Sequence, residues 1–311
     1  MSEGWRVRAL VRNPNRPGLL PQGVEVVPGA LADAQKYRTA LRDCQAVLHV
    51  AGIVKACSLE EYREANARGA ESVARAAADA CPGAMFVLVS SQSAAGPSRT
   101  GRPVGENDPP RPVSWYGISK LEGEQAVRGR RNGPWCVVRL CVVYGAGDPG
   151  VLELFKTVES GWAPILAGGR TRIQLIAVED LTRILYASAL RPELSGRTTF
   201  AAAQTVTTGE LTREIAALRR PPAREIPLPA WAVRAAGAWE SLRQRLTGKA
   251  RPFNADKARE VLQTDWTCDS GPLLRDLQIS VSDFQPWKQG FRTLCRCYVA
   301  SQWLRASMWA V

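Results

Sequence analysis

Tyr116 and Lys120 are four positions apart, and Ser90 and Ser91 lie about 25 residues upstream of them. Positions i and i+4 of a helix share one face, so a phenol and an ammonium at this spacing can point into the same cleft. A neighbouring lysine cation favours the phenolate and lowers a tyrosine pKa that is normally about 10, while a serine hydroxyl can hold the oxygen that gains or loses the proton. These residue types indicate proton transfer at a hydroxyl or carbonyl group.

Two predicted elements position these side chains. The apolar run 85–89 is of strand type, ends in the serine pair and is stopped by Gly96 and Pro97. A helical stretch near 117–130 follows, after the Pro/Gly-rich segment 99–112, which we place as a loop over the site. Because ligands of open α/β sheets bind at the carboxyl ends of the strands, this arrangement brings the serines to the expected place for a reacting group.

The first half of the chain continues the same alternation of short strands and helices. This alternation is typical of βαβ units and predicts a parallel sheet. After about residue 150 the pattern changes to helices and short strands that we interpret as a smaller lobe. The predicted strands are 6–11, 24–27, 46–51, 84–90 and 136–143, and the predicted helices are 34–43, 59–80 and 117–130.

Six stretches carry a resemblance to one family, in chain order 6–12, 46–52, 85–91, 111–124, 137–148 and 176–181. They resemble the extended and atypical short-chain dehydrogenase/reductase superfamily, which includes NAD-dependent epimerases and dehydratases and 3β-hydroxysteroid dehydrogenase-like enzymes. The resemblance implies an α/β fold with a Rossmann-like, doubly wound parallel sheet and a smaller C-terminal substrate lobe. It implies an NAD(P)-binding domain over 1–150 and a lobe over 151–311, from which segments such as 170–190 and 195–203 return to the first domain.

The resemblance also assigns roles to four residues. Tyr116 resembles the family's acid/base, and Lys120 resembles the lysine that lowers the tyrosine pKa and contacts the nicotinamide ribose. Ser91 resembles the hydroxyl that orients the substrate oxygen, and we prefer it to the neighbouring serines because its separation from Tyr116 suits the family. Asn66 lies where the family has a helix asparagine that supports the site.

The start of the chain departs from the family pattern. A dinucleotide-binding fold begins with a strand and a glycine-rich turn, whose backbone N–H groups hold the pyrophosphate. Here Met1 to Trp5 leads directly into the run 6–11, which resembles the family's second strand. We therefore expect a domain that is incomplete at its N-terminus, with unpaired backbone edges in its middle. Residues 145–150 match Gly-x-Gly-x-x-Gly but follow the tyrosine helix, so we interpret them as a substrate-side loop in which Asp148 caps the next helix.

Cofactor preference depends on Arg12, at the end of the second-strand-like run. An arginine there favours the 2′-phosphate of NADP, whereas an acidic residue would favour NAD, so we expect NADP. The alternative is that Arg12 is an ordinary exposed arginine.

A single histidine and eight cysteines without a Cys-x-x-Cys pair do not form a usual zinc set, so we expect no metal. The resemblance places cofactor contacts at Arg12, His49, Ala51, Gly52, Leu140 and Val143, in addition to Tyr116 and Lys120.

Composition limits the partners. The net charge is +12, but the basic residues are scattered and are not interleaved with aromatic residues, so we expect no nucleic-acid partner. No apolar run reaches about 18 residues, which predicts no membrane span. A peripheral membrane contact through 231–242 stays open beside the simpler interpretation, an amphipathic helix packed on its own domain. Free thiols and the lack of a signal peptide favour the cytoplasm, and a homodimer stays open.

Two functions compete on this basis. The first is an NAD(P)-dependent oxidoreductase, epimerase or dehydratase that acts on a secondary alcohol or ketone of a small molecule, which could be sugar-nucleotide, sterol-like or isoprenoid-like. The second is a non-catalytic, nucleotide-binding or subunit-like relative, or an inactive truncated product. The Ser/Tyr/Lys set favours the enzyme, while the absent glycine-rich turn favours the second reading and predicts weak cofactor binding by the chain as written.

Overall fold

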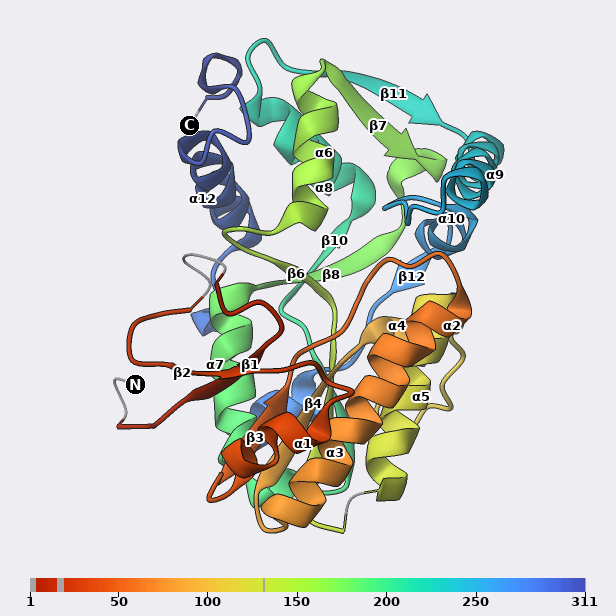
Figure 1. The fold of residues 1–311 in the computed structure, drawn as a ribbon. Coiled ribbons are helices and arrows are strands. Elements are labelled where there is room, and N and C mark those ends of the chain that lie inside the picture. Colours follow the sequence, from red (N-terminus) through yellow and green to blue (C-terminus); the bar gives the residue numbers. More distant parts are fainter. Residues whose placement is uncertain (1–3, 16–19, 131, 311) are drawn as a thin grey trace.

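The computed structural model describes residues 4–15, 20–130 and 132–310. The first three residues of the stretch from Met1 to Trp5 lie outside the described part. Most elements before residue 150 occupy the lower half of Figure 1, and most later elements occupy the upper half, with α7 (Val178–Ala189) returning to the lower half. The division of the chain into two domains at about residue 150 remains a prediction.

A four-stranded parallel sheet forms the centre of the lower half, in the order β3-β4-β5-β9. Alternate residues of a strand point to opposite faces, and here both faces are covered, as is typical of parallel sheets. Phe86 and Leu88 pack with α3 (Gly69–Ala80) and α5 (Trp115–Arg130) on one face, whereas Val87 and Val89 pack with α7 and α11 (Gly271–Leu277) on the other. The strands are β3 (Ala46–His49), β4 (Met85–Ser91), β5 (Trp135–Leu140) and β9 (Arg197–Ala201).

Two further parallel strands, β1 (Arg8–Val11) and β2 (Glu25–Pro28), form a sheet of their own. No strand pairing joins either of them to β3 within the described residues. Leu48 of β3 and Val50 just beyond it are consequently exposed. The break lies where the sequence predicts unpaired backbone edges.

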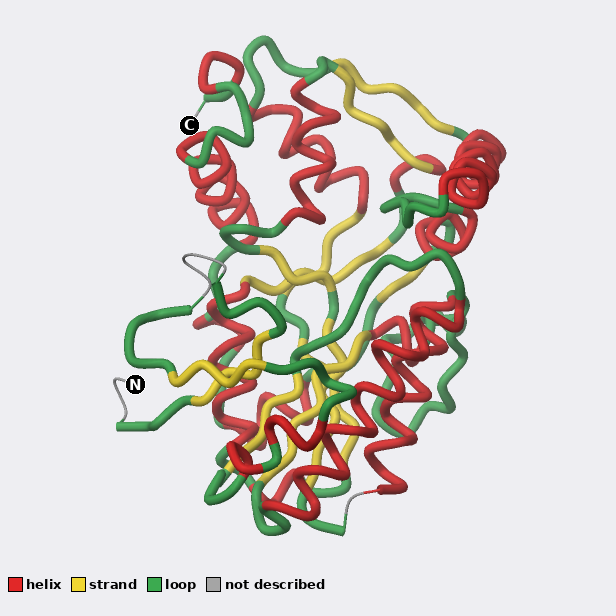
Figure 2. Tube along the Cα trace, viewed as in Figure 1, coloured by secondary structure: helices red, strands yellow, loops and turns green. Residues whose placement is uncertain are grey.

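The predicted strand 136–143 is wrong as a single element, because the chain changes sheets within it. β5 ends at Leu140, Cys141 donates its backbone N–H to Ala201, and β6 (Val142–Tyr144) pairs with β8 instead of the central sheet. β8 also pairs with β10 and β12, and β7 and β11 form a separate parallel pair (Figure 2). These strands are β7 (Trp162–Leu166), β8 (Arg172–Ala177), β10 (Gln204–Thr207), β11 (Arg224–Leu228) and β12 (Asp265–Trp266).

The helices follow the predicted ranges with three differences. The range 34–43 divides into a short α-helix and a 3₁₀ turn, 59–80 contains a π-helical segment, and 117–130 begins earlier. The helices are α1 (Ala34–Tyr37), α2 (Leu59–Tyr62), α3 (Gly69–Ala80), α4 (Gln92–Ala95), α5 (Trp115–Arg130), α6 (Pro149–Glu159), α7, α8 (Thr208–Leu218), α9 (Ala230–Thr247), α10 (Ala255–Val261), α11 (Gly271–Leu277) and α12 (Trp287–Ala300). Shorter turns are η1 (Thr39–Leu41), η2 (Arg63–Arg68, the π-helical one), η3 (Ala167–Gly169), η4 (Pro192–Leu194), η5 (Val281–Asp283) and η6 (Ala306–Met308).

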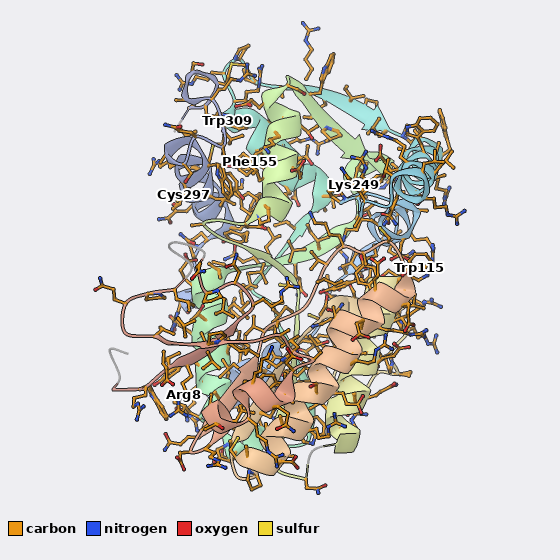
Figure 3. All side chains as sticks on the ribbon, in the orientation of Figure 1. Arg8, Trp115, Phe155, Lys249, Cys297 and Trp309 are labelled. Atoms are coloured by element: carbon orange, nitrogen blue, oxygen red, sulfur yellow. The ribbon has the colours of Figure 1, made fainter. Side chains whose placement is uncertain are left out.

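The upper half has its own aromatic core. Phe155 of α6 packs against Phe291, Tyr298 and Trp309, and Figure 3 shows Phe155 and Trp309 together in the upper half. Asp148 caps α6 as predicted, since its carboxylate accepts the backbone N–H groups of residues 150 and 151.

The helix α9 agrees with the simpler interpretation of residues 231–242 in part. It packs through Val233, Gly237 and Gln244, whereas Trp231 and Trp239 are exposed. The helix therefore packs on its own domain as the simpler interpretation expects, but Trp231 and Trp239 lie outside the packed face. No helix in the described ranges is both long and apolar enough to cross a membrane.

Candidate active site

The two serines at the end of β4 point in different directions, because successive side chains of a strand alternate. Ser90 is buried and donates its hydroxyl to Glu124 Oε1 at 2.5 Å. Ser91 caps the short helix α4 by accepting the backbone N–H of Ser93 at 3.1 Å, and its hydroxyl is close enough to the Tyr116 phenol to lower the pKa of that group. The structure therefore brings Ser91, and not Ser90, together with Tyr116.

Tyr116 and Lys120 lie in the first turns of α5. Burial raises the pKa of Tyr116 to about 12, and the neighbouring Ser91 hydroxyl opposes this rise. Burial lowers the pKa of Lys120 to about 8, while the carboxylate of Glu124 opposes that fall. The direction at Tyr116 is opposite to the one that the Tyr/Lys spacing predicts, because desolvation of the phenol dominates and Lys120 Nζ donates to Val89 O at 2.7 Å.

The start of α5 is held by residues from the far end of the chain. The Ser114 hydroxyl accepts the backbone N–H of Gly117 at 3.0 Å and donates to Glu260 Oε1 at 2.6 Å. Both carboxylate oxygens of Asp256 accept the backbone N–H of Trp115, at 3.0 and 2.9 Å. Such acidic groups satisfy and stabilise a helix N-terminus. Sequence reasoning missed Asp256 and Glu260, although Ser114 carries a readable N-cap signal.

Asn66 lies in the π-helical segment η2, a geometry that is frequent at functional sites. Its Oδ1 accepts the backbone N–H of Ile53 at 2.8 Å, and its Nδ2 donates to Ile53 O at 3.1 Å and to Ser119 Oγ at 3.0 Å. The side chain is buried and so connects the loop after β3 with α5. Asn66 therefore ties the loop after β3 to the helix that carries Tyr116 and Lys120, and its role in the site remains a prediction.

Close backbone contacts fix α5 against its neighbours. A Cβ at Gly117 would lie 2.3 Å from the carbonyl oxygen of Ser93, and a Cβ at Gly123 would lie 2.7 Å from that of Asn66. Real Cβ atoms do not approach this closely, so only glycine allows this packing. The approach of α5 to α4 and η2 sets the position of Tyr116 relative to Ser91.

A buried ion pair lies beneath the site. Arg139 of β5 donates to both carboxylate oxygens of Glu124, at 3.0 and 2.7 Å, and both side chains are almost fully buried. Glu124 lies one helical turn after Lys120 and also accepts the hydroxyl proton of Ser90. The pair thus connects β4, β5 and α5 directly below the lysine.

Three predicted cofactor contacts, at Ala51, Gly52 and Leu140, lie at the ends of two strands of the central sheet. Gly52 follows β3, and a Cβ there would lie 2.8 Å from Asn66 Oδ1 and 3.9 Å from Lys120 Nζ. Ala51 beside it is exposed, and Leu140, at the end of β5, is in register with Ser91. Gly52 thus lies close to the Lys120 ammonium, at a position where Asn66 leaves no room for a larger side chain.

The remaining predicted contacts are placed differently. His49 is buried, its Nε2 has no partner among the described residues, and burial together with Lys120 lowers its pKa to about 4. Val143 lies in β6 and has left the central sheet. Arg12 is exposed just after β1, on the separate two-stranded sheet, and Figure 3 shows Arg8 of that sheet on the opposite side of the molecule from Trp115. The described residues before β1 form no turn that could hold a pyrophosphate, so we assign no residues to it.

A cavity lies beside Tyr116, between α5 and the segment that joins α9 to α10. Its lining combines aromatic and aliphatic side chains with two acids and two basic residues. No group of three or more metal-binding side chains occurs in the part of the chain that the structure describes. The lining residues are Val54, Tyr62, Tyr116, Arg251, Pro252, Asn254, Asp256, Lys257 and Glu260.

A parallel sheet covered on both faces, with a Ser/Tyr/Lys set at the carboxyl end of β4, defines a Rossmann-like oxidoreductase fold. Residues 1–200 match the family model described as the NAD dependent epimerase/dehydratase family, and the chain belongs to this family. It is therefore an enzyme of the nicotinamide-dependent epimerase/dehydratase type, as the resemblance implied.

Particular relatives span much of the chain. A ceramide reductase from Caulobacter vibrioides (strain NA1000 / CB15N) is 35% identical over 274 residues, which cover 87% of this chain and 81% of the relative. A UDP-glucose 4-epimerase from Vibrio cholerae is 27% identical over 224 residues, covering 68% of each chain. The solved structure of MoeE5 in complex with UDP-glucose and NAD has a TM-score of 0.70 at 20% identity, covering 97% of this chain and 93% of the other.

Proposed function

We propose that this enzyme reduces a ketone on a long-chain, ceramide-type lipid to the secondary alcohol, with a nicotinamide cofactor. The observation that carries the proposal is that Tyr116 lines the cavity and lies beside the Ser91 hydroxyl, which opposes the rise of the Tyr116 pKa on burial. A phenol and a hydroxyl that converge on one point can hold a carbonyl oxygen and protonate it.

The charges of the cavity favour a neutral substrate over a sugar nucleotide. Lys257 Nζ is 2.6 Å from Glu260 Oε2, and Arg251 Nε is 3.5 Å from Glu240 Oε2. Because both basic side chains of the lining are paired with carboxylates, they are poorly placed to bind a diphosphate. The similarity to a ceramide reductase over 87% of the chain supports the same choice.

The residues of this chain supply the proton and orient the substrate. Ser91 would donate a hydrogen bond to the substrate oxygen, and Tyr116 would transfer its phenol proton to that oxygen as the carbonyl becomes a hydroxyl. Lys120, charged below about pH 8, would stabilise the phenolate that remains. A bound nicotinamide cofactor would supply the hydride to the carbonyl carbon. Asn66 would keep α5 and the loop after β3 in place.

Cofactor choice is part of the proposal. We propose NADP over NAD because Arg12 is exposed after β1 and forms no ion pair with a described residue, so its guanidinium is free for a 2′-phosphate. We also expect weak binding by this chain, since no described residue is assigned to the pyrophosphate. Fluorescence titration with NADPH and NADH tests both statements; tight binding of NADH would contradict them.

Consumption of reduced cofactor tests the reaction. We expect turnover with a ketone-bearing ceramide-type lipid in mixed micelles and none with UDP-glucose or a sterol ketone. The Ser91→Ala variant should lose at least about tenfold in kcat/KM, whereas Ser93→Ala, a matched change two residues away, should retain the wild-type value. Turnover of UDP-glucose alone would contradict the lipid substrate, and equal activity of the two variants would contradict the role of Ser91.

A further inference from the structure

The helix α9 presents an apolar stripe to solvent. Trp231, Trp239, Leu242 and Leu246 are 71%, 61%, 48% and 78% exposed. Together with the exposed Ala235 they are spaced by four, four, three and four residues, so they form one continuous face of the helix. Two tryptophans and two leucines on one face form a patch that a protein exposed only to water rarely presents. Figure 1 shows α9 at the outer edge of the upper half.

The opposite face of α9 fixes this orientation. A Cβ at Gly237 would lie 2.7 Å from the Ala258 side chain, so α9 and α10 are in close contact there. Gln244, which is buried, donates to Cys57 O at 3.2 Å and accepts the backbone N–H of Arg251 at 3.1 Å. The helix cannot rotate to bury its tryptophans without breaking these contacts.

Basic residues border the stripe. Arg234 and Arg245 lie along one edge of it, and Lys249 follows the end of the helix. All three are exposed, and none forms an ion pair with a described carboxylate, whereas Glu240 pairs with Arg243. An aromatic and aliphatic stripe edged by unpaired cations is typical of helices that lie in the interface of an anionic bilayer.

We propose that α9 docks this enzyme on the surface of a bilayer that contains anionic lipid. The tryptophans and leucines enter the boundary between headgroups and acyl chains, and the three basic residues contact lipid phosphates. A second copy of the chain fits this face less well, because a symmetric pairing through α9 would bring the same unpaired cations together.

The position of α9 connects this surface with the reaction. Arg251 and Pro252, just after the helix, line the cavity beside Tyr116, and Gln244 contacts the loop that carries Val54 on the same lining. Docking would thus hold the cavity next to the bilayer in which a lipid ketone dissolves. The docking proposal rests on the proposed function for the identity of the substrate. Vesicle binding can be measured without turnover, so the docking proposal and the proposed reaction can fail independently.

Flotation of the full chain with vesicles tests the proposal. We expect the wild type to bind vesicles of phosphatidylcholine with phosphatidylglycerol. The partition coefficient of the double variant Trp231→Ser/Trp239→Ser should be at least about tenfold lower, because the variant lacks two aromatic anchors at the interface. The Trp303→Ser variant is the matched control, because Trp303 is 42% exposed and follows α12 on the other side of the upper half (Figure 1). The Arg234→Gln/Arg245→Gln variant should lose the preference for anionic vesicles.

The outcomes separate the alternatives. All four variant positions of α9 are exposed, so circular dichroism and thermal unfolding should match the wild type. Equal flotation of the wild type and the tryptophan double variant would overturn the proposal. The proposal would also be overturned if the wild type did not bind vesicles and light scattering showed a dimeric wild type but a monomeric double variant. The stripe would then be an interface between copies of the chain.

Discussion

The single histidine of the chain gives a sharp prediction about acid stability. Burial and the Lys120 charge lower the pKa of His49 from 6.5 to about 4. The folded protein therefore keeps the imidazole neutral where the unfolded chain binds a proton, so its stability is fully present above about pH 6.5 and is lost as the pH falls towards 4. A gap of about two and a half pKa units corresponds to roughly 3 kcal/mol, of which about 2 kcal/mol is lost by pH 5.

Urea unfolding of the wild type and of His49→Gln at pH 7 and pH 5 measures this contribution. The wild type should lose about 2 kcal/mol more than the variant between the two pH values, because the variant has no imidazole to protonate. The imidazole resonance of the folded wild type, which one histidine makes unambiguous, should titrate far below its usual range. Equal losses for both proteins, or an imidazole that titrates near 6.5, would refute the reasoning.

Three other predictions concern the elements around the site. Glu124→Ala leaves Arg139 charged and buried without its partner, so the free energy of unfolding in urea should fall by about 3 to 5 kcal/mol. The control Glu122→Ala, at a more exposed position, should lower it by less than about 1 kcal/mol, and an equally small loss for Glu124→Ala would contradict the prediction. Gly117→Ala places a Cβ 2.3 Å from the Ser93 carbonyl oxygen and should lower both the melting temperature and kcat, since α5 must move; an unchanged kcat would show that the close approach does not position the site. Because the pKa of Lys120 is about 8, kcat/KM should fall as the pH rises above that value and the ammonium is lost, and a flat profile to about pH 10 would contradict its electrostatic role.

The local part of the site could be predicted from the sequence. The strand that ends in Ser91 and the helix that carries Tyr116 and Lys120 depend on short-range patterns of apolar and polar residues, and the structure has both. The cap at Asp148 is equally local. Chain-order landmarks gave the family, because six of them in sequence resemble one fold.

Long-range features could not be predicted. Asp256 and Glu260 hold the start of α5 from about 140 residues away, and no pattern near Tyr116 signals them. The change of sheet at Cys141 depends on strands far along the chain, because the residues before Cys141 pair with β9 and those after it pair with β8. The direction of the Tyr116 pKa shift was wrong because spacing gives the neighbouring charge but not the degree of burial.

The central claim is that Tyr116 transfers the proton in a nicotinamide-dependent reduction. The most direct test compares kcat/KM of the wild type, Tyr116→Phe and Tyr186→Phe with the ketone-bearing lipid; Tyr186 is a half-exposed tyrosine on α7, outside the site. We expect Tyr116→Phe to lose at least about 10²-fold, in the range typical of general acid catalysis, and Tyr186→Phe to retain full activity. A Tyr116→Phe variant within about twofold of the wild type would contradict the account.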